Sequence, residues 1–165
     1  MLLIGLGGNL PSSAGAPVAT FAAALARLEA AGVTVVARSP WYESAPVPAS
    51  DQPWFVNGVV QVATQLGPAE LLALLHQIEA DFGRLRHAPN AARTLDLDLL
   101  AYDELIQKDH APILPHPRLH ERAFVLLPLA DIAPAWRHPV AGVTPAAMID
   151  GLDRGQLIRL LEPPS

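Results

Sequence analysis

The chain contains 165 residues, 51% of them hydrophobic, which predicts one domain over residues 1–165 with a sizeable buried core. Its 11 basic and 16 acidic residues give a formal net charge of −5, which argues against nucleic acid or an anionic membrane as a partner. The absence of cysteine excludes disulfides and thiolate metal sites, so any metal must have oxygen or imidazole ligands.

The N-terminal half predicts two strands and a helix before a hairpin. The first residues, MLLIGLGGNL, lack a basic segment and form too short an apolar run for a signal peptide or a membrane span, so we expect a cytoplasmic protein. Residues 2–6 predict a buried strand, and GGNLPSS, residues 7–13, predicts a turn. One apolar face from Val18 onward predicts a helix that ends near Gly32. Residues 33–44 predict a strand that runs into a proline-rich loop, and residues 54–66 predict a second, antiparallel strand.

The C-terminal half adds a second amphipathic helix, which Pro68 opens and Gly83 ends. Residues 84–93 carry three arginines without an apolar period and predict an exposed basic loop, and RTLDLDLLAYD then predicts a strand. Residues 123–134 predict a short buried helix broken near Pro128, and residues 144–150 a short capped helix. The final segment is compatible with a strand or a helix. The order β, α, β, β, α, β predicts a ferredoxin-like α+β sandwich, a mostly antiparallel sheet with helices packed on its faces.

The segment RTLDLDLL places two carboxylates inside an otherwise apolar strand. Because alternate side chains of a strand share a face, Asp96 and Asp98 point one way and the neighbouring leucines the other. Their backbones lie about 7 Å apart at a rise of about 3.3 Å per residue, so their oxygens can converge on one cation or bridge two. Oxygen ligands without cysteine favour Mg²⁺. The alternative is a solvated edge strand whose carboxylates serve only solubility.

Basic residues surround this strand. Arginine presents a rigid fork of donors that matches phosphate oxygens, and the chain has a single lysine. This composition around a DxD pair favours a metal-bound polyphosphate, although ordinary ion pairs with Glu79, Asp81 and Glu121 would also explain single arginines. The residues concerned lie between positions 84 and 122 and are Arg84, Arg86, Arg93, Arg118, Arg122, His87, His110, His116 and His120.

Asn57 interrupts the apolar run WFVNGVV, where a buried amide must find hydrogen-bond partners. Its donor and acceptor can recognise the edge of a heterocycle, and Phe55 shares its face of the strand. The alternative is an Asn-Gly bulge. GLGGNL matches neither GxxxxGK[ST] nor GxGxxG, so a tight turn explains Gly7 and Gly8 better than a phosphate loop does.

Six segments in order resemble one family. LGGNL, YESAPV, QPWFVNGVV, IEADFGR, RTLDLDLL and PHPRLHERAFVLLPLADIAP have the order and spacing of 6-hydroxymethyl-7,8-dihydropterin pyrophosphokinase, over roughly residues 1 to 135. The resemblance implies transfer of pyrophosphate from ATP to the hydroxymethyl group of the pterin, with AMP as the other product, in tetrahydrofolate biosynthesis. It also implies a ferredoxin-like fold and two Mg²⁺ ions.

The resemblance assigns roles residue by residue. It implies that Asp96 and Asp98 bind the metals and that Arg93, Arg122 and His116 are catalytic. The implied pterin contacts are Ser44, Phe55, Asn57 and Phe124, and the implied nucleotide contacts are Glu79, Arg84, Arg86, Arg93, His116 and Arg122. The chain departs from the family where the loop HAPNAAR is one residue shorter and lacks a tryptophan and an arginine. It also has His76, Ala111, Ile113 and Pro117 at positions that contact the nucleotide in some members.

These residues predict an enzyme that works by alignment and charge stabilisation, with ATP and the pterin as small-molecule partners and the loop 84–92 closing over the nucleotide. We expect a monomer without nucleic-acid or membrane partners. Two other classes stay open at this point. A metal-dependent nucleotidyltransferase or nuclease also uses DxD with arginines, and a non-catalytic nucleotide-binding domain would not require both carboxylates.

Overall fold

The computed structural model describes residues 1–46, 48–83 and 93–161 of the chain. The predicted loop 84–92, with Arg84, Arg86 and His87, lies outside the described residues. In chain order the elements are β1 (Leu2–Gly8), α1 (Pro17–Ala30), β2 (Thr34–Arg38), β3 (Tyr42–Ser44), β4 (Phe55–Ala63), α2 (Pro68–Asp81), β5 (Asp96–Tyr102), the 3₁₀ helix η1 (Leu119–Glu121), α3 (Ala123–Ile132), α4 (Pro145–Asp150) and β6 (Ile158–Leu160).

The strands form one six-stranded sheet in the order β5-β1-β4-β3-β6, and β2 also pairs with β4. Each pairing between these strands is antiparallel. The two central strands, β1 and β4, face each other from Leu2 opposite Val62 to Gly8 opposite Val56. This arrangement confirms the predicted α+β sandwich with a mostly antiparallel sheet.

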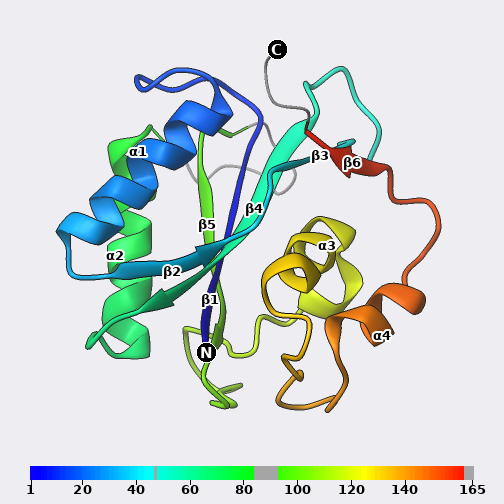
Figure 1. Cartoon of the computed structure of the whole chain (residues 1–165). Helices are drawn as coiled ribbons and strands as arrows, with labels where there is room; N and C mark the ends of the chain where they lie inside the picture. The colour runs from blue at the N-terminus through cyan, green and yellow to red at the C-terminus, as the bar shows by residue number, and fades with distance from the viewer. Residues whose placement is uncertain (47, 84–92, 162–165) are drawn as a thin grey trace.

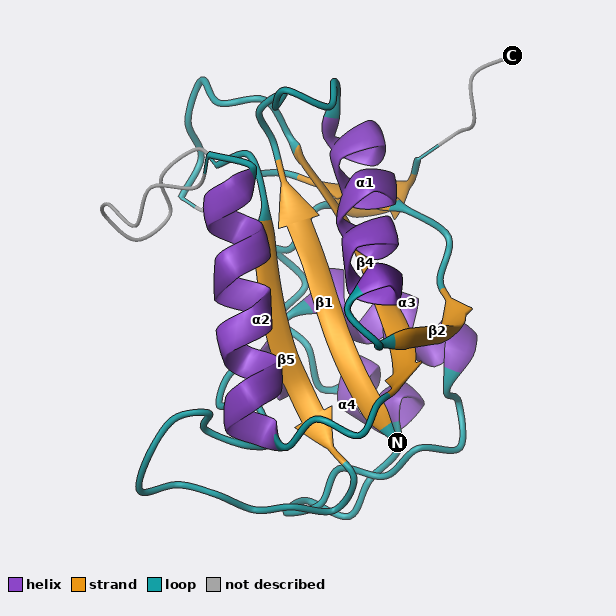
Figure 2. Ribbon diagram, turned by 90° about the vertical axis from the view of Figure 1, so that its left-hand side faces the viewer, coloured by secondary structure: helices purple, strands orange, loops and turns teal. Residues whose placement is uncertain are grey.

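Helices cover both faces of the sheet. Figure 2 shows α1 and α2 side by side on one face, with α3 and α4 behind the sheet, and Figure 1 shows the same layers edge-on. Alternation along β1 divides the core in two, because Ile4 and Leu6 pack toward α1 and α2 while Leu3 packs toward α3 and α4. Strand β5 divides likewise, with Leu97 and Leu99 in the first core and Leu100 in the second.

Three sequence predictions of local structure need correction. The predicted turn at residues 7–13 begins later, because β1 continues through Gly8. The strand predicted over residues 33–44 is two strands, separated where Pro40 has no N–H for the ladder. Helix α3 is not broken at Pro128, since it continues to Ile132 with Pro128 buried inside it. Its almost wholly apolar sequence packs against the sheet, and that burial offsets the hydrogen bond that proline removes.

The C-terminal part resolves what the sequence left open. Helix α4 forms as predicted, with the Thr144 hydroxyl accepting from the Ala147 N–H at its start. The last segment is a strand, β6, which extends the sheet beyond β3. Within the described residues, no helix has the length and apolar character needed to cross a membrane.

Candidate active site

Two cavities meet at one wall. The larger, about 630 Å³, lies between the sheet, the start of α3 and the segment that leads to β6. The smaller, about 480 Å³, lies beyond β5 between α2 and the loop before η1. The residues that line both are Arg93, Asp96, Asp98 and Arg122. Two carboxylates and two guanidinium groups therefore stand where the contents of the cavities would meet.

The aspartates lie on the face of β5 that the leucine pattern predicted. Leu97 and Leu99 point into the core under α1 and α2, while Asp96 and Asp98 line the larger cavity on the opposite face and also reach the smaller cavity at the edge of the sheet. Across the ladder, Gly7 of β1 pairs with Asp96 and Gly5 pairs with Asp98. A Cβ at Gly5 would meet only the Leu100 side chain, at 3.4 Å or more, whereas the missing side chain of Gly7 leaves space between Asp96 and Asn57.

The donor set of this wall fits a hard divalent cation that keeps several non-protein ligands. No cluster of three or more histidine, aspartate or glutamate side chains capable of holding a metal occurs in the described part of the chain. Asp96 and Asp98 supply two carboxylates, and the Arg93 Nη1 donates to Asp96 Oδ2 over 2.9 Å. Mg²⁺ typically takes one or two protein carboxylates and completes its shell with water and phosphate oxygens. The residues fit such ions together with a polyphosphate.

The backbone of Arg93 is fixed by Asn9, a buried side chain at the end of β1. The Arg93 N–H donates to Asn9 Oδ1 over 2.9 Å, and the Asn9 N–H donates to the Arg93 carbonyl over 2.9 Å. The Asn9 side-chain amide also donates to Gln52 Oε1 and to the Pro53 carbonyl, each over 3.1 Å. Asn9 therefore joins the start of β5 to the loop before β4, and it sets the direction from which the Arg93 guanidinium leaves.

Arg122 and His116 line the smaller cavity and are partly buried. Burial lowers the pKa of Arg122, an effect that the carboxylate of Asp98 opposes. Burial and the charge of Arg122 lower the pKa of His116 to about 4, so its imidazole is neutral at pH 7. The Arg118 N–H donates to His116 Nδ1 over 3.2 Å, which leaves Nε2 as the protonated nitrogen. His116 is therefore a neutral hydrogen-bond donor.

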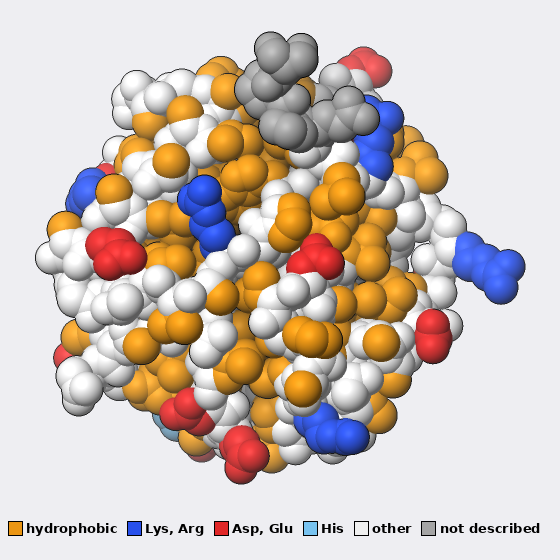
Figure 3. All heavy atoms as spheres, viewed as in Figure 1, with side chains coloured by type: hydrophobic (Ala, Val, Ile, Leu, Met, Phe, Trp, Pro, Cys, Tyr) orange, Lys and Arg blue, Asp and Glu red, His pale blue; other side chains and the backbone are white. Residues whose placement is uncertain are grey.

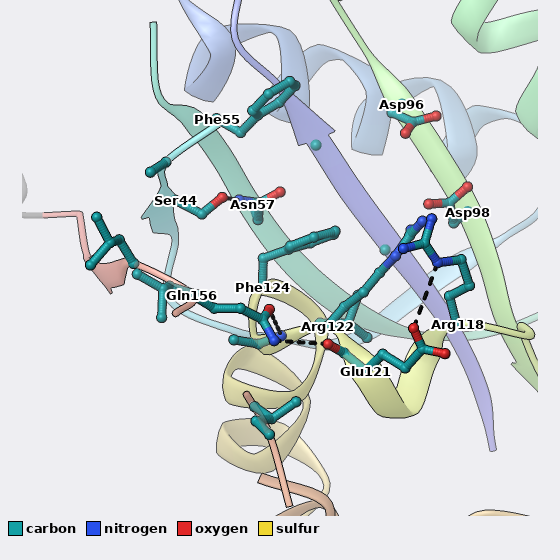
Figure 4. A pocket seen from close by; sticks show the side chains of 18 of the residues that line it. Ser44, Phe55, Asn57, Asp96, Asp98, Arg118, Glu121, Arg122, Phe124 and Gln156 are labelled. Atoms are coloured by element: carbon teal, nitrogen blue, oxygen red, sulfur yellow. Dashed lines mark hydrogen bonds and ion pairs between the residues drawn. The ribbon is translucent and has the colours of Figure 1, made fainter. Parts of the chain in front are cut away.

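The four residues predicted to contact a pterin all line the larger cavity: Ser44, Phe55, Asn57 and Phe124. Figure 4 shows them on one side of the cavity, with Asp96 and Asp98 on the other. The buried Asn57 Nδ2 donates to the buried Ser44 Oγ over 2.8 Å, which fixes the orientation of the amide. The alternative of an Asn-Gly bulge is wrong, because the pairing of β4 with β1 runs through Asn57 without a register shift.

The predicted nucleotide contacts in the described residues gather around the smaller cavity. Glu79 of α2 is buried in its wall, and its Oε2 accepts from the Leu97 N–H over 2.8 Å, so this carboxylate also fixes α2 against β5. Arg84 and Arg86 lie outside the described residues. Four positions at which the chain departs from the family that it resembles also line this cavity: His76, Ala111, Ile113 and Pro117.

Some residues of the site were not predicted from the sequence. Gly7 was assigned to a turn, yet its backbone is extended, and a Cβ there would lie 3.2 Å from Asn57 Oδ1. Asn9 was not singled out, although a lone amide after an apolar strand is a usable signal. Gln156 also lines the larger cavity, although it lies 33 residues after Ala123, the first residue of α3. No pattern in the sequence predicted it.

Comparison with known proteins gives matches to one family in sequence and in fold. The model of the family described as 7,8-dihydro-6-hydroxymethylpterin-pyrophosphokinase (HPPK) matches residues 3–134. A 2-amino-4-hydroxy-6-hydroxymethyldihydropteridine pyrophosphokinase of Synechocystis sp. is 40% identical over 152 residues, 92% of this chain and 75% of that protein. The protein of the same name from Methylorubrum extorquens is 43% identical over 132 residues, 79% of this chain and 81% of that protein.

Among solved structures, the fold matches Plasmodium falciparum HPPK-DHPS crystallised with pteroate, with a TM-score of 0.70 at 15% sequence identity. The match covers 91% of this chain and 44% of that one. The chain thus spans less than half of that two-part protein, and the likeness concerns the fold of the corresponding part.

Proposed function

Because the chain belongs to the 7,8-dihydro-6-hydroxymethylpterin-pyrophosphokinase family, we propose that it transfers pyrophosphate from ATP to the hydroxymethyl group of 6-hydroxymethyl-7,8-dihydropterin. The products are AMP and the pterin diphosphate, and the reaction belongs to tetrahydrofolate biosynthesis. One observation carries the assignment to this site: the two cavities share a wall made of Asp96, Asp98, Arg93 and Arg122. A transfer between two substrates needs such a boundary, because donor and acceptor atoms must meet there in line.

The larger cavity suits the pterin. It has a buried amide whose orientation Ser44 fixes, and aromatic rings at Phe55 and Phe124. An oriented amide offers one donor and one acceptor edge to a heterocycle, while aromatic rings supply surfaces for stacking. The smaller cavity, with Glu79, His116 and the arginines, would then take ATP.

Asp96 and Asp98 would hold two Mg²⁺ ions. When bound, these ions would neutralise charge on the phosphates of ATP and ease loss of the proton from the pterin hydroxyl. Arg93 would be held in place for the same phosphates by its hydrogen bond to Asp96 and by its backbone bonds to Asn9. Arg122 points toward Asp98 from the start of α3 (Figure 4).

The remaining polar groups would stabilise charge in the transition state rather than form a covalent intermediate. Arg93 and Arg122 present guanidinium donors to the oxygens on which charge develops. His116 is neutral at pH 7 and would donate from Nε2 to a phosphate oxygen, so it acts as a donor and not as a cation. Hydrolysis of ATP is the competing reaction, and closure of the loop 84–92 over the nucleotide remains a prediction about residues outside those described.

The test compares Asp98, a carboxylate of β5 that lines both cavities, with Asp103, a carboxylate that follows β5 and lines neither. Asp98→Asn keeps the shape of the side chain and removes its charge, whereas Asp103→Asn removes a carboxylate that binds the amino terminus just beyond β5. AMP release from ATP and Mg²⁺ is measured with and without the pterin. We expect pterin-dependent AMP formation in the wild type and the Asp103 variant and a loss of at least about 100-fold in the Asp98 variant. A wild type that binds ATP without pterin-dependent AMP formation would favour a nucleotide-binding domain.

A further inference from the structure

One side chain brackets Arg122 from outside the segment matched by the family model. The Gln156 Oε1 accepts from the Ala123 N–H over 2.9 Å, and the Gln156 Nε2 donates to the Glu121 carbonyl over 2.9 Å. These two backbone groups belong to the residues before and after Arg122. Figure 4 shows the Gln156 amide reaching this point from the far wall of the cavity.

Arg122 lies between two helices. Arg122 follows η1 and precedes α3, with extended backbone angles of φ −112° and ψ 109°. Its own N–H has only a 3.4 Å bond to the Leu119 carbonyl. The first N–H groups of a helix have no partner within the helix, and Gln156 supplies one for Ala123. The amide thus takes the place that a neighbouring strand would take beside an extended residue.

The segment that carries Gln156 is itself anchored. β6 pairs with β3, with Ile158 opposite Ser44, and the Ala45 N–H donates to the Leu157 carbonyl over 3.0 Å. Arg159 also stacks on Trp54, its guanidinium carbon 4.5 Å from the ring centroid. Gln156 therefore transmits the position of the sheet edge to the start of α3.

Two side chains depend on that position. Arg122 sends its guanidinium toward Asp98, and its guanidinium carbon lies 5.3 Å from the centroid of the Phe124 ring. A rotation of the backbone at Arg122 would displace the cation and the ring together. Geometry of this kind matters for transfer chemistry, because a displacement of about 1 Å can lower the rate on the order of 100-fold.

We propose that Gln156 is a positioning residue for the pyrophosphoryl transfer, acting through the two backbone groups that flank Arg122. The proposal rests on the proposed function and adds to it a contribution from a segment beyond residue 134, where the match to the family model ends. Gln156 does not act on the substrates itself. Its amide fixes the conformation from which the Arg122 guanidinium reaches the shared wall.

The experiment removes the two hydrogen bonds of the Gln156 amide and asks whether the resulting decrease in kcat depends on the presence of Arg122. Gln156→Met keeps the length of the side chain without its hydrogen bonds, and Gln156→Asn keeps the amide one methylene short of both groups. We expect either variant to lower kcat for AMP formation by roughly ten- to a hundredfold. In a chain that already carries Arg122→Ala, the same substitution should change kcat less than about twofold, because residues that act as a unit are not additive.

Thr144→Ala is the control for stability alone, because it removes the cap of α4 without touching Arg122. We expect it to lower the thermal midpoint and leave kcat unchanged in both backgrounds. The proposal is overturned if both Gln156 variants keep wild-type kcat, or if their effect persists in full beside Arg122→Ala. Failure of the wild type to form AMP would instead refute the proposed function, so the two failures are distinguishable.

Discussion

The absence of a side chain at Gly7 leaves space beside the Asn57 Oδ1 atom, the hydrogen-bond acceptor of that amide. Gly7→Ala fills this space with one methyl group and so tests whether the pterin needs it. In the ladder, Gly7 of β1 lies directly opposite Asn57 of β4. A Cβ at Gly7 would lie 3.2 Å from Asn57 Oδ1 and 3.9 Å from the Val56 carbonyl. The methyl group of Gly7→Ala would therefore occupy the side of the amide oxygen from which a ligand donor approaches. The Asn57–Ser44 hydrogen bond, on the other end of the amide, would stay intact.

The expected magnitude follows from the loss of one buried hydrogen bond. A hydrogen bond to a buried group that is left unmade costs about 1–3 kcal/mol. Since about 1.4 kcal/mol is tenfold in affinity, the dissociation constant of the pterin should rise roughly 5- to 150-fold. The fold itself should not suffer, because replacing glycine by alanine inside a strand removes a conformational cost of about 0.5–1 kcal/mol.

Titration of the pterin by its fluorescence, in the presence of Mg²⁺ and a non-transferable ATP analogue, measures this affinity. Gly5→Ala is the matched control on the same face of β1, because its Cβ would meet only Leu100, at an ordinary 3.4 Å from Cδ1. We expect Gly5→Ala to retain the wild-type dissociation constant of the pterin. Wild-type affinity in the Gly7 variant would refute the role given to the Asn57 oxygen.

Two further predictions concern stability. Gly58→Ala would place a Cβ 2.4 Å from the Cε3 and Cζ3 atoms of Trp41. We therefore expect the free energy of unfolding to fall by about 1–3 kcal/mol, measured by urea titration followed by tryptophan fluorescence. An unchanged urea midpoint would contradict this packing. The buried His138 accepts on Nδ1 from the N–H groups of Val140 and Ala141, and burial lowers its pKa below the usual 6.5. Because the unfolded chain then binds more protons, at His138 as at His116, stability should fall as the pH drops below about 6.5 and be retained above it. His138→Asn should make this fall less steep and leave the part that His116 contributes. The control His110→Asn changes an exposed histidine and should keep the slope.

The strands and helices that follow a clean apolar period were predictable from the sequence. The alternation around Asp96 and Asp98 placed them on one face, and the structure shows that face lining the cavities. Gly8 shows where such reasoning fails. A Cβ there would lie 2.7 Å from the Thr94 carbonyl, so this glycine is needed for space in an extended strand and not for a turn. Sequence alone does not distinguish these two uses of glycine.

Contacts between distant segments account for what was missed. Gln156 forms hydrogen bonds with backbone groups of Ala123 and Glu121, which lie 33 and 35 positions earlier in the chain. No local sequence pattern predicts these contacts. Asn9 likewise acts through Arg93, 84 positions away. Asn57, Asp96 and Asp98 were easier to single out because each interrupts an apolar strand, whereas Ser44 and Phe124 were suggested only by the resemblance to the family. Neither Asn9 nor Gln156 interrupts such a strand.

Figure 3 shows how charged and apolar side chains are distributed over one face of the molecule. On the face it shows, apolar side chains predominate and the charged ones are scattered, with no continuous basic groove. Arg93 and Arg122 of the shared wall line the two cavities, where the proposed function places the phosphates of ATP.

The register of the sheet explains how the site can be precise. Asn57, Gly7 and Asp96 occupy one row across β4, β1 and β5. Neighbouring strands lie about 4.8 Å apart. The backbone of Asn57, which is proposed to hold the pterin, therefore lies about 10 Å across the sheet from the backbone of Asp96, which is proposed to hold a metal. Ladder hydrogen bonds fix this separation, and the glycine between them leaves the row open for a planar ring. The sheet therefore sets the distance between the proposed acceptor and metal positions, while Arg122, at the start of α3, supplies a cation of the shared wall from a backbone that Gln156 contacts on both sides.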